Sequence, residues 1–128
     1  MRYAARIAAA AAAAALFSLT ACGGMTSPGG GGPVTNVTVG NDFFRSVHNG
    51  SQNPAVDTIA AGESFTWTWS AAGSHSIQST GIPPEVFRNS VVMAGANSSY
   101  TITFRNPGTY PYDCAVHGAA MTGVVVVQ

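Results

Sequence analysis

The chain has 128 residues, of which 46% are hydrophobic and 8% are charged, and its formal net charge at pH 7 is zero. This length suffices for one domain with a modest core. Five Lys and Arg residues against five Asp and Glu residues provide no basic face, so the composition argues against nucleic-acid binding.

The first 21 residues are typical of a secretory signal. Arg2 and Arg6 precede an apolar stretch, Ile7 to Leu19, that is too short to cross a bilayer, which takes about 20 residues. The letters LTAC that close this region resemble the bacterial lipobox, in which the cysteine is lipidated and becomes the first residue of the mature chain. We therefore expect Cys22 to anchor an exported protein to the membrane, facing the periplasm or the cell exterior. The alternative is an ordinary signal peptide, residues 1–21, followed by a chance cysteine.

Residues 22–33 are rich in Gly, Pro and Ser and predict a flexible tether, followed by one domain over residues 34–128. Once Cys22 is lipidated, Cys114 has no cysteine partner, so the domain can form no intramolecular disulfide. A lone thiol in an oxidising compartment is a liability unless it is buried or bound to a metal.

The domain is predicted to consist of strands separated by clusters of Gly, Pro, Asn and Ser. Apolar residues alternate with small polar residues, and no segment of the domain has a sustained helical period. This pattern predicts an all-β fold, an antiparallel Greek-key sandwich of about seven or eight strands. The expected strands cover residues 34–40, 64–70, 75–79, 99–105, 109–114 and 122–128.

The alternation also assigns the faces of the strand that ends at the cysteine. Tyr110, Tyr112 and Cys114 share one face, which we expect to point into the sandwich. Asp113 lies on the other face and is expected to be solvated. The sulfur of Cys114 should therefore be sheltered, close to one end of the sandwich.

Three metal-capable side chains, Cys114, His117 and Met121, fall within eight residues, and we expect the last two to lie in a connecting loop. Thiolate and thioether suit Cu(I), and a site of two His, one Cys and a distant axial Met is typical of electron-transfer copper proteins. The second histidine is His75 or His48. His75 is favoured because it begins a predicted strand, whereas His48 reads as an exposed loop residue. Met121 could alternatively be core filler.

The letters GTYPYDCAVH, from Gly108 to His117, are followed by Met and TG before a strand of valines, and TWTW lies upstream. Together these motifs resemble the cupredoxins, and among them the plastocyanin-like blue copper proteins. The resemblance implies a β-sandwich with one type 1 copper ion that shuttles single electrons. His75, Cys114, His117 and Met121 match the ligand positions.

Two positions near the ligands depart from the family pattern. The residue after the first histidine, often asparagine, is Ser76, a shorter side chain with which to tie the ligand loops together. Position 116, commonly proline in plastocyanins, is Val116, whose N–H we expect to donate a hydrogen bond to the cysteine sulfur and to raise the reduction potential.

The expected partners are redox proteins that dock briefly at His117, because the small residues that follow it should leave its ring edge within a flat apolar patch. We expect the protein to act as a monomer. Two other functions remain open: a protein that stores or delivers Cu(I), and a metal-free sandwich that serves as an interaction module. Catalysis is disfavoured, because three histidines in total cannot build the additional copper sites of copper enzymes.

Overall fold

The structure is a computed structural model that describes residues 34–128, and these form an all-β sandwich. Cys22, the expected signal segment 1–21 and the expected tether 22–33 lie outside the described residues. Within residues 34–128 we find no helix capable of spanning a bilayer. The eight strands are β1 (Val37–Gly40), β2 (Phe43–Ser46), β3 (Ala55–Ile59), β4 (Ser64–Trp69), β5 (Gln78–Ser79), β6 (Ser99–Thr103), β7 (Gly108–Cys114) and β8 (Gly118–Val127).

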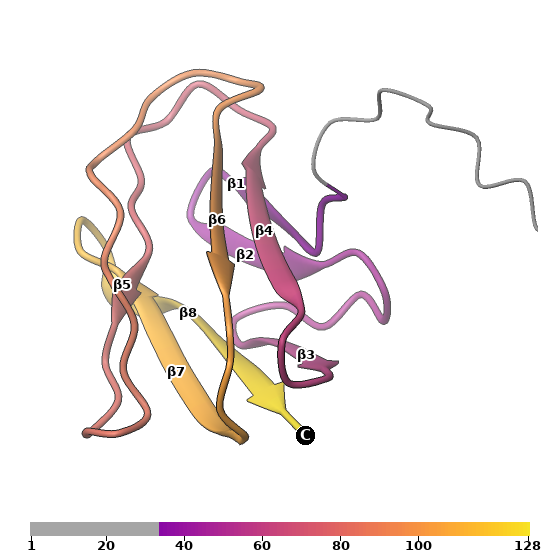
Figure 1. Ribbon diagram of the computed structural model, residues 1–128. Helices are drawn as coiled ribbons and strands as arrows, with labels where there is room; N and C mark the ends of the chain where they lie inside the picture. The colour runs from indigo at the N-terminus through magenta and orange to yellow at the C-terminus, as the bar shows by residue number, and fades with distance from the viewer. Residues whose placement is uncertain (1–33) are drawn as a thin grey trace, which may run out of the picture. The chain divides into compact units, whose positions relative to one another are not determined.

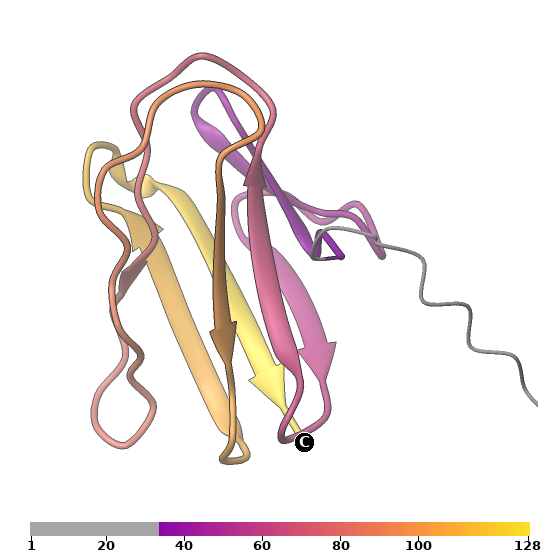
Figure 2. The same ribbon diagram turned by 45° about the horizontal axis from the view of Figure 1, so that its top comes forward.

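The strands form two sheets of four that pack face to face (Figures 1 and 2). One sheet has the order β2-β1-β4-β6 and the other the order β3-β8-β7-β5. The predicted sandwich of about eight strands is therefore confirmed. The expectation of purely antiparallel pairing is wrong for two pairs, because β1 runs parallel to β4 and β3 runs parallel to β8. Both pairs join strands that are distant in the chain, and short hairpins do not restrict the direction of such pairs.

Two strands were missed from the sequence, and several strand boundaries differ. β2 and β3 lie in a region that reads as loop, partly because β3 places Asp57 inward between Ala55 and Ile59. An acid at a core-facing position hides the alternation on which strand prediction depends. Two strands begin at other residues than expected. β5 begins only at Gln78, so the expectation that His75 begins a strand is wrong, and His75 instead forms an isolated bridge with Met93. β8 begins at Gly118, so Met121 lies within a strand and not in the expected loop.

The core is built on aromatic side chains from both sheets. The ring of Trp67 lies 4.7 Å from Phe65, 5.3 Å from Tyr112 and 5.8 Å from Phe87, measured between centroids. The pairs with Phe65 and Tyr112 are edge-to-face and the pair with Phe87 is stacked, and aromatic pairs of both kinds contribute about 0.5–1.5 kcal/mol each beyond their burial. Tyr112 and Cys114 are almost fully buried, which confirms the predicted inward face of β7. The metal-capable cysteine therefore ends a strand that the core holds rigidly.

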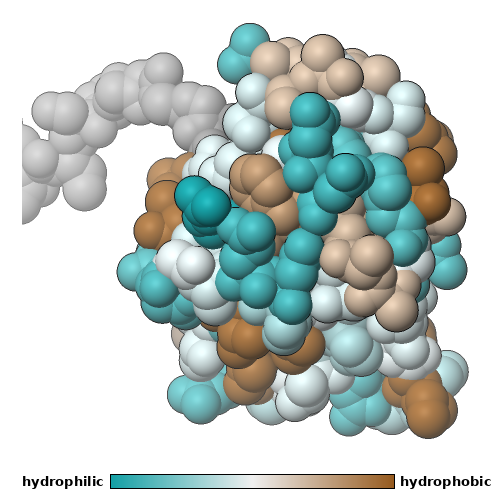
Figure 3. Space-filling view, turned by 180° about the vertical axis from the view of Figure 1, so that it is seen from behind, coloured by the Kyte–Doolittle hydropathy of each residue, from teal (hydrophilic) through white to brown (hydrophobic). Residues whose placement is uncertain are grey.

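The face of the molecule seen from behind carries no single extended apolar patch (Figure 3). Seen from behind, hydrophilic residues cross the middle of the molecule and hydrophobic residues form separate small groups (Figure 3). The largest exposed apolar side chains of the described residues are scattered along the chain: Val34, Val47, Val56, Ile82, Val86, Val91, Val92 and Val116.

Candidate metal centre

Cys114 and His117 are the two ends of one tight turn. Cys114 is the last residue of β7, and the backbone N–H of His117 donates to the Cys114 carbonyl at 3.0 Å. Gly118 then opens β8 with a φ of 55°, a left-handed conformation that glycine adopts without steric cost. The turn thus fixes the distance between thiol and imidazole through the backbone.

His75 reaches the same end of the sandwich from a separate segment. Its backbone pairs with Met93 through two hydrogen bonds, N–H of His75 to the Met93 carbonyl at 3.0 Å and the reverse bond at 2.8 Å. Its ring lies directly against Gly73, where a Cβ atom would come within 2.4 Å of His75 Nε2. Only a residue without a side chain allows this approach, so the ring is confined on that side.

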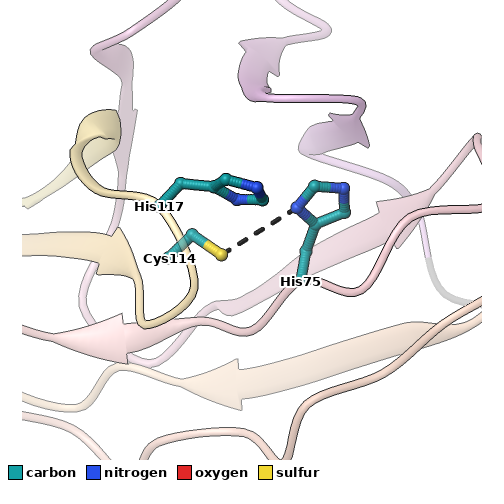
Figure 4. A group of neighbouring side chains, drawn as sticks. All are labelled: His75, Cys114 and His117. Carbon is teal, nitrogen blue, oxygen red and sulfur yellow. Dashed lines mark hydrogen bonds between the residues drawn. The ribbon is translucent and has the colours of Figure 1, made fainter.

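The three donors converge in the structure. Ligand-capable atoms of His75, Cys114 and His117 all lie within 4.8 Å of one another. The Sγ atom of Cys114 is 3.9 Å from His75 Nδ1, and the two imidazole centroids are 4.9 Å apart (Figure 4). Cys114 and His75 are buried, whereas 28% of the His117 side chain is exposed. The centre is therefore sheltered except at one ring.

The ring nitrogens fit a metal ion that joins these donors. His117 Nδ1 is buried and has no hydrogen-bond partner, while its Nε2 lies 3.0 Å from Asp42 Oδ1. Burial, and then the neighbouring His117, lower the pKa of His75 below its usual value. A lowered pKa keeps the imidazole neutral, which is the form that binds metals. One thiol and two imidazoles together form a donor set suited to copper.

Met121 is fully buried in β8, four residues after His117. Its thioether is therefore removed from water. This position agrees with an axial ligand at the end of the chain segment that holds Cys114 and His117. The sequence spacing had placed the residue in a loop, and the strand fixes it more firmly.

Ser76 links the two ligand segments. Its Oγ accepts a hydrogen bond from the Ala115 N–H at 3.1 Å, and its own N–H donates to Cys114 Sγ at 3.5 Å. The hydrogen bond expected from the Val116 N–H to the sulfur does not occur among the described residues. The expected bond is therefore wrong. The Val116 side chain is 52% exposed in the turn between Cys114 and His117, and the backbone N–H from which the sulfur accepts a hydrogen bond is that of Ser76.

His48 does not belong to the centre. Its Nδ1 lies 3.0 Å from Asp57 Oδ1, and the same carboxylate oxygen accepts the hydroxyl of Ser46 at 2.7 Å. The structure thus brings together the predicted His75, Cys114 and His117 and excludes His48. Sequence reasoning missed Asp42, which is 75 residues from His117 in the chain and has no motif that connects the two.

Residues 51–128 match the family model described as copper binding proteins, plastocyanin/azurin family. The chain belongs to the plastocyanin/azurin family. Chloroplastic plastocyanin of Tetradesmus obliquus is 36% identical over 110 residues, which cover 74% of this chain and 68% of the relative. Amicyanin-alpha of Methylorubrum extorquens is 36% identical over 77 residues, 60% of this chain and 63% of that one.

Solved structures agree with the fold. A purple cupredoxin from Nitrosopumilus maritimus superposes with a TM-score of 0.57 at 24% identity and covers 74% of this chain and all of that one. An amicyanin variant in its oxidized state gives a TM-score of 0.51 at 29% identity, over 59% of this chain and 70% of that one. The predicted resemblance to the plastocyanin-like cupredoxins is confirmed, and the chain is a blue copper protein with one type 1 copper.

Proposed function

We propose that this protein carries single electrons between partner proteins through one copper ion held by His75, Cys114, His117 and Met121. The observation that carries the proposal is the convergence of a buried thiol and two imidazoles within 4.8 Å, in a chain of the plastocyanin/azurin family. When bound, copper supplies one-electron chemistry by alternating between Cu(I) and Cu(II). The residues supply a geometry that both oxidation states accept.

Rigidity of the donors favours electron transfer over metal delivery. Cys114, His75 and Met121 are 0%, 2% and 0% exposed, so an acceptor protein cannot reach these ligands without opening the fold. Cys114 ends the strand β7, whose inward side chains belong to the aromatic core. The Ser76 hydroxyl binds the Ala115 N–H and so connects the turn after Cys114 to the segment of His75. A donor set fixed in this way changes little when the metal changes charge, which lowers the barrier to electron exchange.

Electrons enter and leave through the ring of His117, the donor with the greatest exposure. Val116, Ala119 and Ala120 flank it in the chain and are exposed, uncharged and, except for Val116, small. A partner can therefore bring its redox centre close to the imidazole edge in a brief, weak encounter. We propose that the protein has no enzymatic activity of its own and works as a monomer.

The test is a titration of the domain, residues 33–128, with Cu(II), followed by visible and EPR spectroscopy, with Cys114→Ala as the matched variant. We expect an intense blue thiolate-to-copper band with narrow hyperfine splitting in the wild type and neither feature in the variant. A wild type that binds Cu(I) but stays colourless with Cu(II) would support copper storage or delivery. No binding in either state would leave a metal-free sandwich.

We also propose that the protein is exported and that Cys22 carries the lipid that anchors it to the membrane. Residues 22–33 would then hold the domain away from the membrane surface, in the periplasm or outside the cell. The support is the lipobox-like LTAC at residues 19–22 and the Gly-rich stretch after it. Labelled palmitate should be incorporated into the wild type and not into Cys22→Ala, and the variant should appear in the soluble fraction. Equal membrane retention of both proteins would exclude lipid anchoring at this cysteine.

A further inference from the structure

An acidic side chain lies at the outer nitrogen of the exposed histidine. Asp42 Oδ1 is 3.0 Å from His117 Nε2, and 74% of the Asp42 side chain is exposed, so the carboxylate contacts the ring and also faces solvent. The residues that flank His117 in the chain, Val116, Ala119 and Ala120, carry no charge. Asp42 is therefore the acidic side chain that contacts the imidazole where it reaches the surface.

The backbone holds this charge in place. Asp42 lies in the turn between β1 and β2 with a φ of 59°, a left-handed conformation that Asp tolerates better than most residues. The side chain of Asn53 fixes the turn from outside, since its Nδ2 donates to the Asp42 carbonyl at 2.9 Å and its Oδ1 accepts the Phe44 N–H at 3.1 Å. The position of the acid relative to His117 is thus built into the fold.

No arginine of the described residues pairs with Asp42. The salt bridges within residues 34–128 join acids only to histidines, so none of the three arginines of this range pairs with it. Arg45, the nearest in sequence, is directed elsewhere. Its guanidinium donates two hydrogen bonds to Gln52 Oε1 at 2.8 and 2.9 Å and lies 5.1 Å from the centroid of Phe43. No arginine of this range therefore competes with a partner for the solvent-facing side of the Asp42 carboxylate.

We propose that Asp42 makes this surface selective for a redox partner that presents an arginine or lysine side chain beside its own redox centre. The inference rests on the proposed electron transfer through His117 and adds the chemistry of the partner. A cation that pairs with Asp42 brings the partner to the ring edge, whereas an anion is repelled there. Rim charges of this kind act chiefly on the rate of association and on its salt dependence.

The first test needs no copper. Metal-free full-length protein, labelled with ¹⁵N, is titrated with the inert paramagnetic cation hexaamminechromium(III) and, separately, with the anion hexacyanochromate(III). We expect the cation to broaden the amide signals of residues 41–43 and 116–119 at concentrations at which the anion does not. Asp42→Asn, which keeps the shape of the side chain, should remove this broadening. Glu63→Gln is the control, because it removes one charge in the turn between β3 and β4 and keeps an acceptor for the Ala60 N–H.

The second test uses the copper-loaded, reduced protein. One electron passes from Cu(I) either to tris(phenanthroline)cobalt(III), which becomes cobalt(II), or to ferricyanide, which becomes ferrocyanide. At a separation of about 6 Å in water, one charge on the protein changes the encounter by roughly threefold for each unit of probe charge, and salt reduces the effect. In Asp42→Asn at low salt we expect oxidation by the cobalt cation to slow by about three- to tenfold and oxidation by ferricyanide to accelerate similarly.

The outcomes separate the two proposals. Equal rates for wild type and Asp42→Asn with both oxidants, after correction for any change in reduction potential, would overturn the proposed selectivity for cationic partners. The surface around His117 would then bind its partners through apolar contacts alone. Broadening at residues 116–119 that persists in the variant would overturn it as well. A wild type without a blue band would instead refute the electron-transfer function, while the chromium titration would still decide whether the surface selects cations.

Discussion

The molecule contains two histidine–aspartate pairs with the same spacing and opposite burial. His48 Nδ1 and Asp57 Oδ1 are 3.0 Å apart, as are His117 Nε2 and Asp42 Oδ1. In the first pair the acid is 2% exposed and the histidine 56%, whereas in the second the acid is 74% exposed and the histidine 28%. The contact distance alone therefore does not reveal what either pair does.

The partner that is buried decides the role. Asp57 lies inside the sandwich on β3, so its carboxylate requires donors; Ser46 and His48 supply them to Oδ1, while Oδ2 is buried without a partner among the described residues. The Ser46 hydroxyl joins β2 to β3 through this carboxylate, and His48 adds a contact from the turn after β2. In the second pair the imidazole is the sheltered member, and its inner nitrogen is buried without a partner, as a metal ligand requires. Asp42, outside, acts on what approaches from solvent.

The largest effect should come from the buried acid. Asp57→Ala leaves the Ser46 hydroxyl and the His48 ring without their acceptor and opens space in the core. We expect the free energy of unfolding to fall by about 2 kcal/mol in denaturant titrations, while the blue band of the folded, copper-loaded protein is unchanged. A variant that loses the band while it remains folded would mean that the two pairs are coupled.

Removal of the exposed member of the same pair should cost less. His48→Ala leaves Asp57 with the Ser46 hydroxyl on the same oxygen, so one of two donors is retained. A loss of about 1 kcal/mol in the free energy of unfolding is expected from denaturant titrations. A loss as large as that of Asp57→Ala would show that the histidine is the principal partner.

Asp113 is an acid that has no histidine partner among the described residues, and it can be compared with the two histidine–aspartate pairs. The expectation that it is solvated is wrong, because it is half-buried, its Oδ1 has no partner and burial raises its pKa. The folded state therefore holds its proton more tightly than the unfolded chain, whose pKa is about 3.9. Stability due to this group is lost as pH rises through the folded pKa.

Asp113→Asn should remove the loss of stability that ionisation of this buried acid causes. We expect a gain of about 0.5 kcal/mol in the free energy of unfolding at pH 7, which shrinks as pH falls and vanishes below about pH 3, where the acid is protonated in both states. Denaturant titrations at several pH values measure the difference. A gain that is the same at all pH values would attribute it to packing and not to ionisation.

The smallest change in stability should come from the acid at the copper end. Asp42→Asn, which tolerates the left-handed backbone as well as Asp does, removes the charge from a contact between an exposed carboxylate and a partly exposed ring, and surface pairs of this kind contribute about 0–1 kcal/mol. Denaturant titrations of the metal-free protein should place the variant within about 0.5 kcal/mol of the wild type. A larger loss would give Asp42 the structural role that we assign to Asp57.

The sequence alone determined the features that depend on neighbours in the chain. Alternation along β4 and β7 predicted their buried faces, and the eight residues from Cys114 to Met121 predicted a copper site, because a strand end and the turn after it place donors close together. His75 was found by a local argument as well, from its place after a turn and the choice between only two remaining histidines.

Only the tertiary structure decided contacts between segments far apart in the chain. No local pattern shows that β1 runs beside β4 in parallel, that an acid of β3 faces inward, or that the turn at Asp42 contacts a ring 75 residues away. The hydrogen bond to the sulfur likewise comes from Ser76 across the site and not from the adjacent turn. Local periodicity specifies which face of a strand is buried, whereas packing of the two sheets determines which charges and donors meet at its ends.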